Sequence, residues 1–358
     1  MTSEKILQQF GQMITALQQG KSLTRIQSAK CWKEVIENTQ PELHQGAFLA
    51  ALSMKGETED EIAGSYDAIF QSDTRKVDLS HLPVVENCGT GMDTLKTFNI
   101  STAASVIAAA AGVPMAKHGA RAITSKCGTV DVLEALGVDV ECDVETVKRS
   151  IEKVGIGIFN GMSGQVHPEA LFRILSQIRF GSTLNIAGSL ANPASPRLGV
   201  RGVWSPDMVY KTAMTMASIG YKRAIVVFGW NDAGDAGIDE FSTMGISKVA
   251  QLYEDGAIEE YEVRPEAFGI RRVAYGEIAA AENVVSAARV VRDVLDGHGT
   301  MAQQDIVCLN AAPILLVAQK VSSLVEGVDM ARQLIDGGQA AAKLKEWVAH
   351  QQGVSKTA

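Results

Sequence analysis

The chain has 358 residues, of which 46% are hydrophobic and 21% charged, an ordinary composition for a globular protein long enough to form two domains. Its 41 acidic residues outnumber its 33 basic residues and give a formal net charge of −8. This charge argues against nonspecific binding to nucleic acid or to an anionic membrane as the main activity.

The N-terminal segment lacks the basic region, the apolar core and the cleavage site of a signal peptide. No apolar run reaches the length of a membrane span. The five cysteines are odd in number and form no Cys-x-x-Cys pair, which is typical of reduced thiols and implies no zinc site. We therefore expect a cytoplasmic protein.

Residues 4–72 carry helical periodicity almost throughout, and no strand is predicted there. Thr58, with Glu61 three residues later, has the pattern of a capping box at the start of a helix. An earlier apolar stripe fits either the core of this helical region or a dimer interface, and the residues alone leave both open. The stripe consists of Ile6, Phe10, Met13, Ile14 and Leu17.

After residue 79, short β-rich runs alternate with helical ones, a pattern typical of crossover units on a largely parallel sheet. Residues 311–350 return to helical periodicity. The sequence therefore predicts an α/β fold with a small helical domain, residues 1–76, and a larger α/β domain, residues 77–358. Helices around residues 165–182 are candidates to join the helical domain. The predicted strands are Pro83–Glu86, Val113–Lys117, Ile156–Phe159, Arg223–Phe228, Ile258–Val263 and Asp305–Leu309.

The first predicted strand leads into Gly89-Thr90-Gly91, and the polar segment Asn99–Thr102 then opens an alanine-rich helix. Glycines let backbone N–H groups approach an anion, and a helix N-terminus adds a favourable dipole. Lys117 and Lys126 supply positive charge downstream. A lone Gly-x-Gly is more often a tight turn, but these neighbours favour a cradle for a phosphorylated small molecule.

A second polar cluster follows the predicted strand Arg223–Phe228 and contains the adjacent carboxylates Asp239 and Glu240. Ligands of open α/β sheets gather at the carboxyl ends of strands. Mg²⁺ commonly uses one or two carboxylates together with substrate phosphates. A solvated acidic loop is the alternative for this cluster alone; beside a phosphate cradle, the metal site is favoured.

Two histidines are candidate ligand-binding residues. His118 follows Lys117 at a predicted strand end, and His167 precedes Pro168 at the start of a helix. Each could equally be a hydrogen-bonded structural residue. No Ser-His-Asp or Cys-His arrangement stands out, so the sequence does not support covalent catalysis.

Taken together, the motifs resemble the anthranilate phosphoribosyltransferase family, whose fold is like that of nucleoside phosphorylases. The resemblance covers essentially the whole chain. It includes Met54–Thr58, Gly89–Gly137, Asn192-Pro193, Gly237–Glu240, Ile258–Tyr261 and Leu309–Ala312.

The resemblance implies transfer of a phosphoribosyl group from phosphoribosyl pyrophosphate to an aromatic amine, with anthranilate, the substrate in tryptophan biosynthesis, as the default acceptor. It implies Mg²⁺ held through Ser101, Asp239 and Glu240, and a homodimer formed by the helical domain. The implied donor-binding residues are Gly89, Thr90, Gly91, Asp93, Asn99, Ser101, Thr102, Lys117 and Thr129.

The acceptor half departs from the family pattern. Met92 replaces the fourth glycine of the loop, and Ala120 stands where the family has an asparagine that contacts anthranilate. Gln177 falls at or near the family's carboxylate-binding arginine. Arg173, or Arg179 just beyond, could supply that cation from a neighbouring turn. The candidate acceptor-binding residues are Gly89, His118, Ala120, His167, Arg173 and Gln177.

Three other functions remain as alternatives. A family member could use a different amine that lacks the ortho carboxylate. A pyrimidine nucleoside phosphorylase would share the fold, but the segment Asn99–Thr102 and the pair Asp239-Glu240 belong to the transferase pattern. A nucleic-acid-binding paralogue without catalysis should lose those carboxylates and gain a basic face, whereas this chain has a pI near 5.4.

Overall fold

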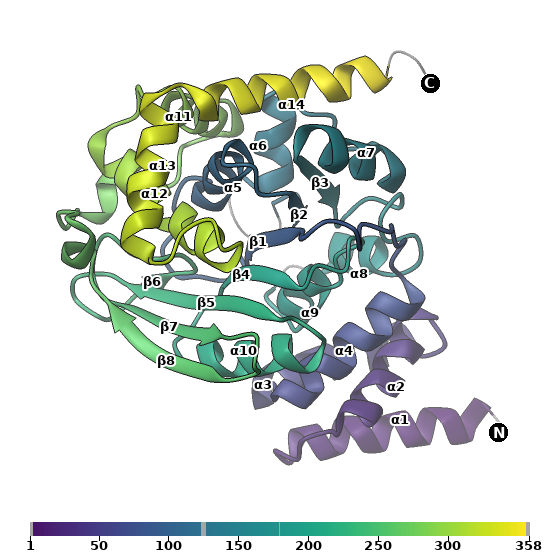
Figure 1. Cartoon of the computed structure of the whole chain (residues 1–358). Helices are drawn as coiled ribbons and strands as arrows, with labels where there is room; N and C mark the ends of the chain where they lie inside the picture. The colour runs from purple at the N-terminus through teal and green to yellow at the C-terminus, as the bar shows by residue number, and fades with distance from the viewer. Residues whose placement is uncertain (1–2, 123–126, 179, 356–358) are drawn as a thin grey trace.

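The computed structural model describes residues 3–122, 127–178 and 180–355. Four helices at the N-terminus are followed by a body in which helices cover both faces of one sheet (Figure 1). None of the described helices is both long enough and apolar enough to cross a membrane.

The N-terminal helices are α1 (Ser3–Gln18), α2 (Arg25–Ile36), α3 (Glu42–Lys55) and α4 (Glu59–Ser72). The predicted capping box at the start of α4 is confirmed, because Thr58 accepts a hydrogen bond from the Glu61 N–H and Glu61 accepts one from the Thr58 N–H. Phe10, Ile14 and Leu17 of the predicted stripe are buried against the other helices of this region. These members of the stripe therefore belong to the helical core.

The sheet has the strand order β3-β2-β1-β4-β5-β7-β8, with the short strand β6 paired to β5. Strands β1 to β5 are mutually parallel, whereas the pairings of β5 with β6, of β5 with β7 and of β7 with β8 are antiparallel. The prediction of a largely parallel sheet is confirmed. The strands are β1 (Val85–Gly89), β2 (Met115–Gly119), β3 (Ile156–Asn160), β4 (Leu198–Gly202), β5 (Arg223–Trp230), β6 (Gly237–Ile238), β7 (Ser247–Leu252) and β8 (Ile258–Val263).

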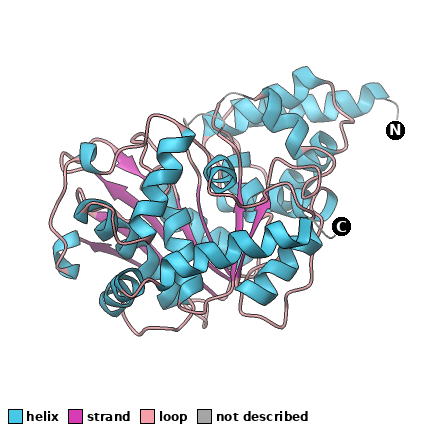
Figure 2. Cartoon of the chain, turned by 90° about the horizontal axis from the view of Figure 1, so that it is seen from above, coloured by secondary structure: helices cyan, strands magenta, loops and turns pink. Residues whose placement is uncertain are grey.

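Helices pack on both faces of this sheet, as Figure 2 shows from above. One face carries α5 (Ile100–Ala110), α6 (Thr129–Ala135), α7 (Val144–Val154), α11 (Val284–Leu295), α12 (Met301–Val317), α13 (Leu324–Asp336) and α14 (Gln339–Ser355). The opposite face carries α8 (Leu171–Gln177), α9 (Leu184–Leu190) and α10 (Asp207–Ser218). Two short 3₁₀ helices, Pro265–Phe268 and Tyr275–Glu277, follow β8.

Helices α8 and α9 share a hydrophobic core with the N-terminal helices. Leu171 and Ile174 of α8 and Leu184 of α9 are buried in the same cluster as Phe48 and Leu52 of α3. The Asp73 carboxylate, just after α4, also accepts hydrogen bonds from the backbone N–H groups of residues 169–171. Helices α8 and α9 are thus packed against the N-terminal helices.

One predicted strand is wrong. Residues Asp305–Leu309 lie inside α12, which begins at a capping box formed by Thr300 and Gln303. The run Ile306–Leu309 is fully apolar because this helix is buried on nearly every side, and a short apolar run of that kind does not distinguish a buried helix from a buried strand. Strands β4, β6 and β7 were not predicted.

Candidate phosphate- and metal-binding site

A pocket lies at the carboxyl ends of β1 and β2, against the N-terminus of α5 and beside α8 and α9. It brings together twelve of the predicted residues. These are Gly89, Thr90, Gly91, Asp93, Asn99, Ser101, Lys117, His118, Ala120, Thr129, Asp239 and Glu240. Thr102, His167, Arg173 and Gln177 do not line it.

The loop after β1 and the acidic pair after β6 are joined by hydrogen bonds. The Gly91 N–H donates to Asp239 Oδ2 at 2.7 Å, and the Ser101 N–H donates to Glu240 Oε1 at 3.1 Å. At Gly89, a Cβ would lie 2.4 Å from Asp239 Oδ2, so only glycine permits this approach. The two carboxylates therefore accept hydrogen bonds from backbone N–H groups that are suited to binding an anionic ligand.

Both carboxylates are buried, with 8% of Asp239 and 9% of Glu240 exposed. Burial, and then the charge of Asp93, raises the pKa of Asp239. Burial, and then the charge of Asp239, raises the pKa of Glu240 well above its usual value. Two adjacent buried anions are unfavourable together, and a divalent cation is the natural partner for them.

This pair fits Mg²⁺. The described residues contain no group of three or more histidine, cysteine, aspartate or glutamate side chains placed to hold a metal by themselves. Mg²⁺ does not require such a cage, because it retains waters and takes substrate phosphates as ligands beside one or two carboxylates. Asp239 and Glu240 would hold the ion, with the Ser101 hydroxyl close by on the α5 N-terminus.

Lys117 lies beneath the same loop. It is almost fully buried, and its Nζ donates to the Asn87 carbonyl at 3.0 Å and to Ser105 Oγ at 3.1 Å. Burial lowers the pKa of Lys117 to about 8. An ammonium group held in this way gains most from a bound anion, because the anion offsets the cost of burying its charge.

Two threonine hydroxyls beside the pocket have no partner. Thr90 Oγ1 and Thr102 Oγ1 are both buried and make no hydrogen bond within the described protein. Asn99, the N-cap of α5, also makes no side-chain capping bond. Buried polar groups are almost always satisfied, so an unpartnered hydroxyl on the pocket wall at Thr90 indicates a polar ligand there. Thr102 is enclosed in α5 and does not line the pocket.

Lys96 was missed by the sequence prediction. Its Nζ donates to the Gly91 carbonyl and to Asp93 Oδ1, each at 2.8 Å, and it lines the pocket. Its position three residues after Asp93 was the available signal. Lys96 fixes the end of the glycine loop and neutralises Asp93.

His118 and His167 form a buried pair. Their Nε2 atoms lie 3.1 Å apart, and the His118 Nδ1 lies 3.0 Å from the Ser189 carbonyl oxygen. Burial, and then the proximity of His167, lowers the pKa of His118 to about 3. Burial likewise lowers the pKa of His167 to about 4. His118 reaches the pocket, whereas His167 supports it from behind.

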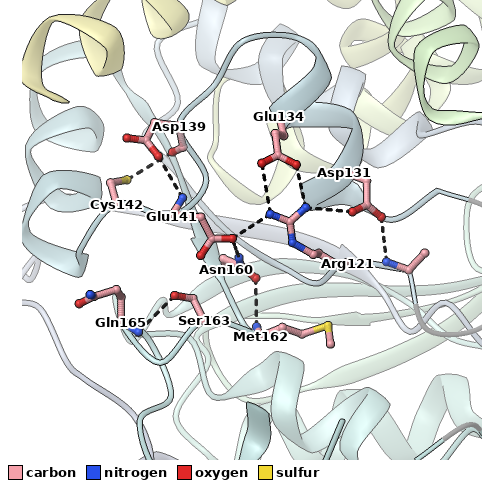
Figure 3. Close-up of polar contacts among 11 residues, drawn as sticks. Arg121, Asp131, Glu134, Asp139, Glu141, Cys142, Asn160, Met162, Ser163 and Gln165 are labelled. Carbon is pink, nitrogen blue, oxygen red and sulfur yellow. Dashed lines mark hydrogen bonds and ion pairs between the residues drawn. The ribbon is translucent and has the colours of Figure 1, made fainter. Parts of the chain in front are cut away.

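Arg121 also lines the pocket, but carboxylates surround it (Figure 3). Its guanidinium lies 3.2 Å from Asp131, 2.8 Å from Glu134 and 2.8 Å from Glu141. Asp131 further accepts hydrogen bonds from the N–H groups of Ala122 and Gly128. This network holds the start of α6 in place. It also neutralises the charge of Arg121 within the protein.

The side of the pocket next to α8 and α9 is mainly aliphatic, with Leu171, Leu175 and Leu184 on its wall. The sequence prediction missed these leucines, because apolar residues on a helix give no local signal of a ligand-binding role.

Arg173 points away from this wall, donating to Gln45 Oε1 at 3.1 Å and to the Val35 carbonyl at 2.8 Å. It is therefore engaged by the N-terminal helices. Gln177 is exposed. The other two predicted cations, Arg179 and Lys126, lie outside the described residues.

Comparison with known proteins agrees with this architecture. Residues 81–341 match the α/β domain, and residues 11–72 the helical bundle domain, of the glycosyl transferase family. The anthranilate phosphoribosyltransferase of Anaeromyxobacter dehalogenans is 40% identical over 341 residues, covering 94% of this chain and 97% of that protein. The enzyme of the same name from Petrotoga mobilis is 35% identical over 344 residues, covering 95% and 96%.

Solved structures agree as well. The crystal structure of anthranilate phosphoribosyltransferase from Thermus thermophilus matches with a TM-score of 0.84 at 30% identity, covering 95% of this chain and 99% of that one. The Saccharomyces cerevisiae enzyme, solved in complex with phosphoribosyl pyrophosphate and Mg, matches with a TM-score of 0.82 at 21% identity, covering 98% and 99%. At that identity the second match supports the fold alone.

Proposed function

Since the chain belongs to the glycosyl transferase family, with anthranilate phosphoribosyltransferases among its relatives, we propose that it transfers the 5-phosphoribosyl group of phosphoribosyl pyrophosphate to anthranilate. One observation carries the proposal. The pocket joins an anion-binding glycine loop and helix N-terminus to a buried pair of carboxylates through two hydrogen bonds. A pyrophosphate with its magnesium ion requires that combination.

The pocket suits a reaction without a protein nucleophile. Loss of pyrophosphate from C1 of the donor builds positive charge on the ribose and negative charge on the leaving group, so alignment and electrostatic stabilisation dominate. Bound Mg²⁺ would supply charge for the leaving group. The N–H groups of Gly91 and Ser101 each have one hydrogen to donate. When the donor binds, its phosphate oxygens would accept these hydrogen bonds in place of the carboxylates of Asp239 and Glu240. Lys117 adds a buried positive charge beside them.

The acceptor would lie on the opposite side of the ribose, against the aliphatic wall of α8 and α9. Leu171, Leu175 and Leu184 offer apolar contact to an aromatic ring. The amine then attacks C1 from the face opposite the leaving pyrophosphate and inverts the anomeric centre. His118 and Ala120 also line the pocket.

A different amine acceptor is the second candidate. It is favoured by one observation: Ala120 offers no side-chain hydrogen bond, and Arg173 is engaged elsewhere. Pyrophosphate release from phosphoribosyl pyrophosphate, measured with anthranilate and with aniline in turn, separates the two. Preference for anthranilate supports the first function, and preference for the amine without a carboxylate supports the second.

We propose further that the enzyme acts as a cytoplasmic homodimer. The helical domain, assigned as residues 1–76 with the helices near 165–182, carries large apolar side chains on its surface. Leu43 is 86% exposed and Met54 is 87% exposed, and they lie about three turns apart on one face of α3. A patch of that kind on a small domain is typical of an interface.

A further inference from the structure

The histidine pair has more hydrogen-bonding positions than protons. Besides the contact between the two Nε2 atoms, each Nδ1 faces a backbone carbonyl, Ser189 for His118 at 3.0 Å and Asp73 for His167 at 2.7 Å. A carbonyl oxygen can only accept, so both Nδ1 atoms must carry hydrogen. Two neutral imidazoles then have no proton left for the contact between the Nε2 atoms, and a third proton would complete the set.

The charged groups around the pair are bound to other groups of the protein. Arg201 is fully buried and is paired with Glu86, also fully buried. The Asp73 carboxylate accepts hydrogen bonds from three backbone N–H groups and faces the start of α8. Thr74 Oγ1 lies 3.4 Å from the His167 Nδ1 and donates to the Ile69 carbonyl. Without a bound anion, burial holds the pKa of both histidines far below neutrality, so the third proton is absent.

An anion in the acceptor half of the pocket changes this balance. The described lysine and arginine side chains that line the pocket are all committed, Lys96 to Asp93, Lys117 to the Asn87 carbonyl and Ser105, and Arg121 to three carboxylates. His118 is the remaining described wall residue that can gain positive charge. A nearby carboxylate favours the protonated imidazole and opposes the effect of burial.

We propose that the His118–His167 pair takes up one proton when the acceptor binds, and that this shared charge complements the acceptor's carboxylate. The inference rests on the proposed function. His118 would be the residue nearest the acceptor, and His167 a positioning residue that shares its proton. The pair would then be a source of selectivity for a carboxylated amine.

Calorimetry tests this directly. Anthranilate is titrated into the protein with Mg²⁺ and pyrophosphate in place of the donor, so that no turnover occurs, in two buffers of different ionisation enthalpy at pH 6. Because a nearby opposite charge raises the pKa of a histidine by about 1–3, the proposal predicts net proton uptake at this pH with anthranilate and none with aniline, which lacks the carboxylate. Equal proton uptake for the two ligands, or none for anthranilate, overturns it.

Variants provide the second arm. His167→Phe keeps a ring of similar shape but removes both nitrogens, so proton uptake should vanish and KM for anthranilate should rise about tenfold or more, with KM for the donor unchanged. Thr74→Val, which removes the hydroxyl 3.4 Å from the His167 Nδ1 but keeps both imidazoles, is the matched control and should behave as wild type. Undiminished proton uptake in His167→Phe overturns the proposal.

Failure of this inference can be distinguished from failure of the proposed function. If His167→Phe does not fold, as judged by circular dichroism, the wild-type comparison of anthranilate with aniline decides alone. Efficient anthranilate turnover without proton uptake removes only the role of the pair. Absence of any anthranilate turnover contradicts the proposed function itself.

Discussion

At the residue scale, Asp239 and Glu240 carry the largest predicted effect. Replacing them with Asn and Gln keeps their shape but removes the charge that would hold the metal, so kcat should fall by about two orders of magnitude or more. Pyrophosphate release is the measurement. Asp235→Asn, an exposed change in the same acidic segment, is the control and should retain full activity. Full activity of the double variant, or of wild type in excess chelator, would remove the metal assignment.

Because Lys117 is buried, we expect kcat/KM for the donor to depend on pH. Because burial lowers the pKa of Lys117 to about 8, its positive charge is present at neutral pH and is lost as the pH rises through that value. The donor binds the charged form, so kcat/KM for the donor should fall above pH 8, by at most about tenfold per pH unit. Lys117→Met should start low and lose this dependence. A profile for wild type that stays flat to pH 9.5 would contradict the assignment.

Individual residues also show where sequence reasoning stopped. Asp239 and Glu240 were predicted to lie at a ligand-binding strand end, but the hydrogen bond from the Gly91 N–H to Asp239 was not predicted. Arg173 was placed near the acceptor because it shares a helical face with Gln177, but its partners, Gln45 and the Val35 carbonyl, are distant in sequence. Contacts of that range follow from the packing of α8 against the N-terminal helices and leave no local signal.

At the element scale, α8 depends on a residue outside it. Asp73 accepts hydrogen bonds from the N–H groups of residues 169, 170 and 171, at 2.6, 3.1 and 2.7 Å. Asp73→Ala leaves these donors without their partner, so the free energy of unfolding should fall by about 1–3 kcal/mol. Urea unfolding measures the change. Asp78→Ala, at an exposed turn, should change it by less than about 0.5 kcal/mol. An Asp73→Ala variant as stable as wild type would show that α8 is held by packing alone.

The strands show which secondary-structure elements can be predicted from the sequence and which cannot. Five predicted strands overlap observed ones, since four are short and mostly apolar and the fifth, Ile258–Val263, begins and ends with β-branched residues. Strand β4 was overlooked because its Leu198–Gly202 run contains two glycines and Arg201, which the structure pairs with Glu86 in the core. An arginine can be buried in a central strand only when a partner neutralises its charge. That partner, Glu86, lies on β1 and is distant in sequence.

At the scale of the whole molecule, the apolar face of α3 predicts the assembly. Glutamate at Leu43 and Met54 would place charge in the proposed interface, so the double variant should be monomeric where wild type is dimeric. Light scattering at micromolar concentration gives the mass, and circular dichroism confirms the fold. A monomeric wild type would contradict the dimer. The stripe on α1 is not the basis for this prediction, because the helical core buries Phe10 and Leu17.

The architecture itself was predictable, because an N-terminal helical region followed by alternating strands and helices leaves few topologies open. What the sequence could not supply is the balance of charges inside the pocket. Lys117 and Arg121 are held by groups that other elements bring to them, whereas Lys96 is neutralised within its own loop by Asp93. That balance exists only in the folded molecule.

The central claim is phosphoribosyl transfer, and one measurement tests it most directly. The protein is incubated with phosphoribosyl pyrophosphate, Mg²⁺ and anthranilate, and both products are quantified by mass spectrometry and a pyrophosphate assay. We predict N-(5-phosphoribosyl)anthranilate and pyrophosphate in equal amounts, with both formed at least about a hundredfold more slowly when Asp239 and Glu240 are replaced by Asn and Gln. Pyrophosphate released without the anthranilate adduct, or no dependence on anthranilate at all, would contradict this account.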